Sequence, residues 1–129
     1  MQAARRHLSQ LAGLTSLSLD SNLIGDNGAQ ALADSPYLSR LTELGLGHTD
    51  ISTAGARALL LSPHFDTLQS LDLRGNAIDD EGARVLASLP LPESLSTLDL
   101  CDNPIGPGGG QALRESPHLG RVVRLSASP

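Results

Sequence analysis

The side chains of this chain that could do chemistry are four histidines and a single cysteine. His64 and His118 each follow a Ser-Pro pair in well-separated parts of the chain, and His48 and Cys101 belong to other segments. No His-x-x-x-His spacing, paired cysteine, or Cys-His or Ser-His-Asp combination emerges from these positions. We therefore predict no catalytic residues, no metal site and no cofactor, and we do not expect an enzyme.

A glycine-rich segment, residues 106–110, precedes a helical pattern, and such a segment can bind phosphate at a helix N-terminus. A phosphate-binding loop would continue with Lys and then Ser or Thr, but Gln111 and Ala112 follow here. We interpret the segment as a drifted copy of a repeated helix start. Interior glycines cost roughly 0.8–1 kcal/mol each relative to Ala, so we expect a helix at 109–114 that is the shortest or most mobile.

The elements that carry these residues come from one motif, L-x-x-L-x-L-x-x-N/T-x-I, which occurs four times at a fixed interval of 27 residues. Alternate residues of a strand share a face, so the second and third leucines point to a core and the residues between them point outward. The copies begin at Leu14, Leu41, Leu68 and Leu95. Strands are predicted at 15–19, 43–46, 70–73 and 97–100, with a fifth at 123–125.

The second half of each repeat predicts a helix, because Gly-Ala-x-x-Leu segments recur in phase with apolar residues at helical spacing. Ser52 or Thr53, and Asp79 or Asp80, are suited to cap the helix N-termini. Ser-Pro or Leu-Pro pairs end the helices, since a residue before proline avoids the α region. The predicted helices cover 26–33, 53–61 and 80–87, in addition to 109–114.

The repeated motif resembles the leucine-rich repeat family, and in particular its ribonuclease-inhibitor-like subtype, which has a full α-helix in each convex segment. The repeats here are more uniform than in ribonuclease inhibitor, which alternates two repeat types. The resemblance implies an α/β solenoid with a parallel sheet on the concave side and helices on the convex side. It also implies a single domain over residues 1–129, divided into a partial repeat 1–13, repeats 14–40, 41–67, 68–94 and 95–121, and a partial repeat 122–129.

Composition and net charge limit the classes of partner and the cellular location that we expect for this chain. The net charge of −5 argues against nucleic acid and anionic membrane surfaces. No apolar run approaches the length of a membrane span, and the first residues contain no apolar core of a signal peptide. One cysteine cannot form an internal disulfide, which favours a reducing compartment. We therefore expect a cytoplasmic protein whose partner is another protein.

The outward strand positions are free to vary, and they carry charges. In the predicted register Asp72 and Asp99 are lateral neighbours with Arg74 beside them, and Asp20 and Glu43 lie at the margin. We predict that these five residues form a shallow, mildly acidic docking surface for a basic protein segment. Two alternatives remain: a merely solvated face, and a structural or regulatory spacer that is a fragment of a larger leucine-rich repeat protein with no ligand.

The predicted fifth strand has an open edge and an apolar side, formed by Val122, Val123 and Leu125. Val122 lies 27 residues after Leu95, which places it in phase with the repeat. Unpaired strand edges invite pairing with another chain. The sequence therefore predicts self-association through this edge.

Overall fold

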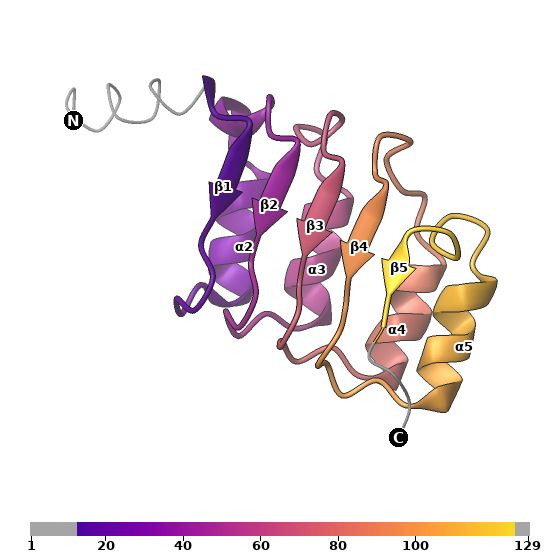
Figure 1. Cartoon of the computed structure of the whole chain (residues 1–129). Helices are drawn as coiled ribbons and strands as arrows, with labels where there is room; N and C mark the ends of the chain where they lie inside the picture. The colour runs from indigo at the N-terminus through magenta and orange to yellow at the C-terminus, as the bar shows by residue number, and fades with distance from the viewer. Residues whose placement is uncertain (1–12, 126–129) are drawn as a thin grey trace.

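The computed structural model describes residues 13–125, which form a parallel sheet of five strands in the order β1-β2-β3-β4-β5. Neighbours in the sheet are also neighbours in sequence (Figure 1), as expected when each repeat adds one strand. Each observed strand is slightly shorter than its predicted range. The strands are β1 (Ser16–Ser18), β2 (Glu43–Gly45), β3 (Ser70–Asp72), β4 (Thr97–Asp99) and β5 (Val123–Arg124).

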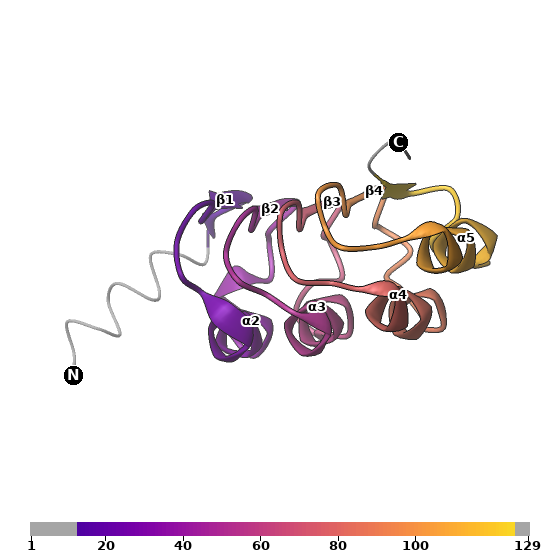
Figure 2. The ribbon, with the colours of Figure 1, turned by 90° about the horizontal axis from the view of Figure 1, so that it is seen from below.

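The helices all lie on one side of the sheet, so that strands and helices form two layers (Figure 2). A short 3-10 helix, η2 (Pro36–Leu38), follows the first α-helix. This arrangement is the predicted α/β solenoid. The α-helices are α2 (Gly25–Ala33), α3 (Thr53–Leu60), α4 (Asp80–Ala87) and α5 (Pro107–Glu115). Of the two predicted partial repeats, residues 1–12 and 126–129 lie outside the described residues.

The core consists of identical leucines stacked from layer to layer. Leu71 and Leu73 have exposed fractions of 0%, and Leu71 is in register with Leu44 on one side and Leu98 on the other. Thin layers of this kind need no aromatic side chains, and the only phenylalanine, Phe65, is buried in the connection before β3. No helix among the described residues is long and apolar enough to cross a membrane.

Asparagine side chains satisfy the backbone where the chain turns away from each strand. Asn76 Oδ1 accepts hydrogen bonds from the Thr49 and Ile51 amides (3.1 and 2.9 Å), and Nδ2 donates to the Leu46 and Leu73 carbonyls (both 2.9 Å). Thr49, which replaces asparagine in its repeat, donates its hydroxyl to the Leu46 carbonyl at 2.7 Å. The expected ladder therefore exists, and threonine performs part of the same role.

Helix α5 is not the shortest helix, which rules out one of the two predicted alternatives, shortest or most mobile. It spans nine residues, as α2 does, while α3 and α4 span eight. The Asp80 carboxylate accepts hydrogen bonds from the Gly106 and Gly109 amides at 2.6 and 3.1 Å and so holds the start of the helix. A Cβ on Gly109 would lie 2.4 Å from Asp80 Oδ1, so glycine is required there for the two helices to approach. The expected mobility of this helix stays a prediction.

Strand β5 is shifted by two residues relative to the 27-residue phase. Val123 pairs with Leu98, whereas the repeat interval would have paired it with Ser96. A two-residue shift keeps every side chain on its face of the sheet. It places Val123 beside Leu98, where the strict phase would have placed Leu125, so Val123 and Leu125 both lie level with the core leucines of β4.

Candidate functional site

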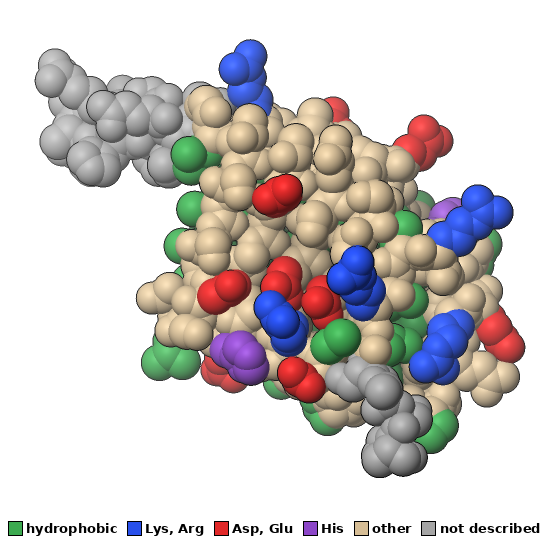
Figure 3. Space-filling view, in the orientation of Figure 1, with side chains coloured by type: hydrophobic (Ala, Val, Ile, Leu, Met, Phe, Trp, Pro, Cys, Tyr) green, Lys and Arg blue, Asp and Glu red, His purple; other side chains and the backbone are tan. Residues whose placement is uncertain are grey.

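The concave face presents its outward side chains in rows that run across the strands. We define the middle row by the paired positions Ser18, Gly45, Asp72, Asp99 and Arg124. We define the end row by the residues two positions later in the four repeats: Asp20, Gly47, Arg74 and Cys101. Charged side chains gather where these rows cross β3, β4 and β5, and hydrophobic side chains are sparse in the middle of this face (Figure 3).

Arg74 lies among three carboxylates. Its guanidinium forms a salt bridge with Asp72 at 3.2 Å, and its backbone amide donates to Asp72 Oδ1 at 3.0 Å. The charges of Asp72 and Asp99, and more weakly that of Asp20, raise the pKa of Arg74. Asp72 and Asp99 are in register on adjacent strands, as predicted. The structure therefore brings together the acidic pair and the arginine that the sequence placed beside it.

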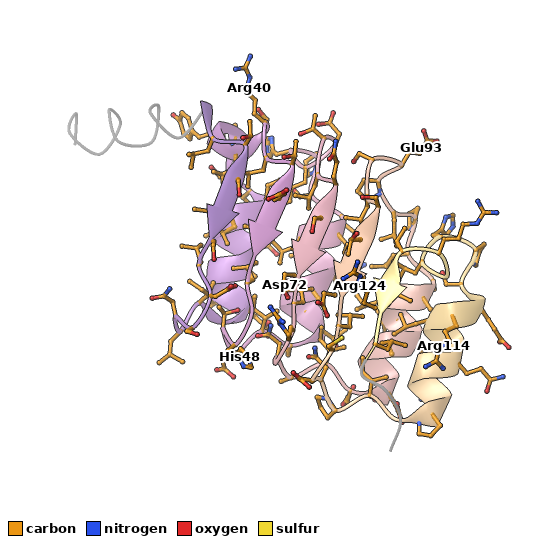
Figure 4. The ribbon with its side chains drawn as sticks, viewed as in Figure 1. Arg40, His48, Asp72, Glu93, Arg114 and Arg124 are labelled. Carbon is orange, nitrogen blue, oxygen red and sulfur yellow. The ribbon has the colours of Figure 1, made fainter. Side chains whose placement is uncertain are left out.

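A second arginine joins this cluster, and sequence reasoning missed it. The 27-residue phase puts Arg124 beside Thr97, but the shifted register of β5 pairs it with Asp99. Arg74 therefore lies beside the acidic pair in the end row. Arg124 follows Asp99 in the middle row (Figure 4). Four carboxylates and two guanidinium groups leave a modest excess of negative charge on this face, less than the sequence alone suggested.

Asp20 and Glu43 lie at the margin of the face, on the first two repeats. The Asp20 carboxylate crosses to the next repeat and accepts a hydrogen bond from the Gly47 amide at 2.7 Å. Glu43 is exposed and accepts a hydrogen bond from the Ser16 hydroxyl at 3.4 Å. Between them Gly45 has no side chain, and a hollow of about 210 Å³ opens above it. The polar residues around this hollow are Ser16, Ser18, Glu43, Ser70 and Asp72.

The aspartates of the concave face are held in place by backbone amides. Asp99 accepts a hydrogen bond from the Cys101 amide at 3.0 Å, just as Asp72 does from Arg74. Such a bond fixes the carboxylate in one rotamer at the end of its strand. These charges therefore form a pre-arranged pattern, which limits the side-chain entropy lost when a partner binds.

The thiol and imidazole groups show no catalytic arrangement in residues 13–125. Burial, assisted by a hydrogen bond to Asp99 and its charge, raises the pKa of Cys101, so its thiol stays protonated at neutral pH. His48 is exposed and its ring packs over Gly75. Within the described range no three His, Cys, Asp or Glu side chains are grouped to hold a metal ion.

Two further aspartates cap the helix of the following repeat, a role that sequence reasoning did not assign. Asp26 on α2 accepts hydrogen bonds from the Ser52 and Gly55 amides (2.8 and 3.0 Å) and so caps α3, as Asp80 on α4 caps α5. The start of α4 is instead capped by its own Asp79, which accepts from the Gly82 amide at 2.8 Å. The repeats thus alternate in pairs, a correction to the expected uniformity. The sequence indicates this alternation, because the equivalent positions 26, 53 and 80 hold aspartate, threonine and aspartate.

The edge residues of the last strand remain partly exposed. Val122, Val123 and Leu125 pack against the core but are not fully covered by it. Strand β5 pairs with β4 on one side, and no sixth strand occurs among the described residues. The outer edge of β5 is therefore open to a partner within the part of the chain that is described.

The family comparison matches four segments of the chain, one in each of the four repeats. The Leucine Rich repeat family matches residues 14–33, 38–60, 67–87 and 92–113, which is most of the chain. The chain belongs to the leucine-rich repeat family. No curated protein matches this leucine-rich repeat chain. A solved structure of leiomodin-1 actin-binding site 2 is similar to it, with a TM-score of 0.68 and 16% identity over 96% of this chain and 78% of the other.

Proposed function

We propose that this leucine-rich repeat chain binds a protein through its concave face and that the partner presents lysine or arginine side chains there. The observation that carries the proposal is the fixed charge pattern of Asp72, Arg74, Asp99 and Arg124 across β3, β4 and β5. Buried positions of the repeat are set by packing, but these outward positions could all have been serine or threonine. Adjacent carboxylates repel, so stability gives little reason to place them together.

The hollow above Gly45 offers a place for a basic side chain of the partner. Glu43 and Asp72 both line it, and Asp20 Oδ1 lies 3.2 Å from where a Cβ on Gly45 would be. The alkyl stem of a lysine can pack against a surface while its ammonium group reaches the carboxylates. A partner that bears one basic side chain here and an acidic group near Arg124 would match the charges of the face.

Binding through this face should be weak and sensitive to salt. Hot spots at interfaces favour aromatic anchors and arginine, and neither concave row contains an aromatic residue. Exposed charges act mainly by steering the encounter, and salt screens them over about 8–10 Å at physiological ionic strength. We expect fast association and fast dissociation.

The leucine-rich repeat family and the likeness to leiomodin-1 support a role in protein binding, and a fold shared at 16% identity does not identify actin as the partner. The alternation of helix caps supports the ribonuclease-inhibitor-like subtype as a finer assignment. A cytoplasmic location belongs to the same proposal and rests on the single cysteine.

The test is a pull-down with three charge-reversed proteins. Asp72→Lys and Asp99→Lys reverse the concave pair, and Glu81→Lys reverses an exposed carboxylate in the first turn of α4 on the convex side. We expect both concave variants to lose the protein that the unmodified chain recovers, while Glu81→Lys retains it and all three keep the circular dichroism of the fold. Retention by the concave variants would place the interface elsewhere.

A second candidate function is a structural or regulatory spacer with an idle concave face. One observation favours it: Asp20, Asp72 and Asp99 all accept hydrogen bonds from backbone amides, so each has a structural role without a partner. The isosteric variants Asp72→Asn and Asp99→Asn separate the two functions. A spacer predicts changes in stability alone, whereas a binding face predicts weaker capture of the partner at unchanged fold.

We also propose that the β5 edge allows self-association. Val123 is paired with Leu98 of β4, and the outer side of β5 has no paired strand among the described residues. Sedimentation velocity at rising concentration should show a growing dimer fraction for the unmodified chain, and Val123→Lys should reduce it. A monomer at all concentrations would contradict this proposal.

A further inference from the structure

The charge of the concave face changes from one end of the sheet to the other. At the end formed by β1 and β2, the carboxylates of Asp20 and Glu43 form no ion pair within the described part of the chain. At the β5 end, the exposed guanidinium of Arg124 also forms no ion pair with a described residue. Between these ends Asp72 and Arg74 form a salt bridge at 3.2 Å. The face therefore has an acidic end and a basic end.

The hollow at the acidic end suits a single lysine side chain. Gly45 lies below this hollow of about 210 Å³ and pairs with Ser18 on β1 and with Asp72 on β3. A Cβ on Gly45 would lie 3.2 Å from Asp20 Oδ1 and 3.3 Å from Ser18 Oγ, so glycine leaves these acceptors unobstructed. A lysine ammonium is a compact charge with three donors, and it can contact carboxylate and hydroxyl oxygens that lie in different directions.

The basic end suits a carboxylate and disfavours a second lysine. Arg124 pairs in register with Asp99, and Figure 4 shows its side chain on the β5 side of Asp72. A guanidinium that forms no ion pair within the described range can bind a partner carboxylate through two parallel N–H groups. A lysine at the same place would be repelled by the arginine. The face therefore discriminates against segments that are basic along their whole length.

The separation of the two ends determines the spacing of the partner's charges. Gly45 and Arg124 lie in the middle row on β2 and β5, three strand spacings apart, which is about 14 Å. Four residues of an extended segment span about 13 Å, and side chains four positions apart lie on the same side of it. Four residues of a helix span only about 6 Å. An extended segment therefore matches both ends with charges four residues apart.

We propose that the partner presents an extended segment with one lysine in the hollow above Gly45 and one carboxylate at Arg124, four residues away. This inference rests on the proposed function of the concave face and adds the polarity and the charge spacing of the partner. It makes the chain selective for a segment of mixed charge over a polybasic one.

The test uses three capped nine-residue peptides of serine and threonine that each carry two charged residues. The first has Lys and Glu four positions apart, the second has Lys and Glu adjacent, and the third has two Lys four positions apart. Each peptide is titrated into the full chain, and its affinity is measured from the NMR signals of the Gly47 and Arg74 amides, which donate to concave carboxylates.

Three variants of the full chain are titrated in the same way. Arg124→Glu reverses the basic end. Arg57→Glu is its matched control, because Arg57 is an exposed arginine on α3, on the other side of the sheet. Gly45→Val fills the hollow without a change of charge, and its Cβ would meet only the side chain of Asp20 and atoms of Ser18, both exposed residues.

We expect the spaced Lys and Glu peptide to bind the unmodified chain about two- to fivefold more tightly than either other peptide, the range for one exposed ion pair. The peptide with two lysines should bind more weakly although it has the larger positive charge. Arg124→Glu should reverse the order of these two peptides, and Arg57→Glu should preserve it. Gly45→Val should weaken the binding of all three peptides.

The outcomes separate this inference from the proposed function. Equal affinities for the three peptides, or an unchanged order in Arg124→Glu, would overturn the polarity and spacing while the concave face remained the binding site. Unchanged binding to Gly45→Val would overturn the placement of lysine in the hollow. If no peptide shifted the Gly47 and Arg74 signals, the proposed function would fail and this inference with it.

Discussion

The first layer of the solenoid, with β1 and α2, and the third layer, with β3 and α4, are built from the same motif but are covered very differently. Leu71 in the third layer is fully buried between Leu44 and Leu98, whereas Leu17 in the first layer has a neighbouring layer on one side among residues 13–125 and is half-buried. The asparagines differ in the same way: Asn76 is buried and Asn22 is exposed. A repeat residue is thus stabilised by its neighbours as much as by its own type.

The largest expected contrast is between the two core leucines. Leu71→Ala removes a side chain enclosed on both sides and should lower the free energy of unfolding by about 2–5 kcal/mol. Leu17→Ala should cost clearly less, because Leu17 is only half-buried and its site can relax. Urea denaturation of both variants measures the difference. Equal costs would show that the first layer is as well covered as the third.

The asparagine ladder should show the next contrast. Asn76→Ala leaves the Thr49 and Ile51 amides without their partner, at a cost of about 2–4 kcal/mol, while the Leu46 and Leu73 carbonyls keep hydrogen bonds from Thr49 and Asn103. Asn22→Ala removes two bonds in an exposed turn and should cost under about 1 kcal/mol. Thermal denaturation gives both values. A cost at Asn22 that matches the cost at Asn76 would break the comparison.

Helix capping extends the comparison to the convex side. The start of α2 receives no side-chain hydrogen bond from its own N-cap residue, Ile24, whereas α5 is capped by Asp80 from the helix before it. Asp80→Ala should destabilise the chain by about 1–2 kcal/mol, as for other lost caps. Glu81→Ala, at the adjacent exposed position, should change stability by no more than about 0.5 kcal/mol. Similar values for the two variants would argue against capping between helices.

The smallest effect concerns Cys101, which the inner layers partly bury. Burial and Asp99 raise the pKa of Cys101, so its thiolate fraction and its alkylation rate increase at a higher pH than for an ordinary thiol. Asp99→Asn removes a negative charge and should speed alkylation at pH 8 by about two- to fivefold. Iodoacetamide kinetics across pH measure this shift. A slower reaction in Asp99→Asn would contradict the assigned cause.

The repeat interval was enough to predict the strands, the helices, the buried leucines and the role of the asparagines. These features depend on the pattern of residues within one repeat, and that pattern is regular from Leu14 to Ile105. The lateral pairing of Asp72 with Asp99 also follows from the interval, because equal spacing places equivalent residues side by side.

Features that depend on contacts between repeats could not be predicted in the same way. The two-residue shift of β5, which brings Arg124 to Asp99, results from competition between phase and apolar burial in the last layer. The cap that Asp80 provides to α5 depends on how closely two helices approach, which no single repeat specifies. Ser21, His48 and Asp102 adopt positive φ at the turn after each strand, and of the residues at this turn position only Gly75 signals such a conformation.

Several backbone amides donate hydrogen bonds to the concave carboxylates, so their NMR signals can test directly whether the concave charges form a binding face. The amides of Gly47, Arg74 and Cys101 donate to Asp20, Asp72 and Asp99 on the concave side. The amides of Gly82 and Gly109 donate to Asp79 and Asp80 on the convex side and serve as matched controls.

The most direct measurement is an NMR titration of the chain with a lysine-rich peptide, followed through these five amide signals at low and at physiological salt. We expect the Gly47, Arg74 and Cys101 signals to shift in a saturable manner, with smaller shifts at higher salt, while the Gly82 and Gly109 signals stay in place. Equal shifts at the concave and convex amides, or shifts confined to the convex side, would contradict the claim that the concave face is the binding surface.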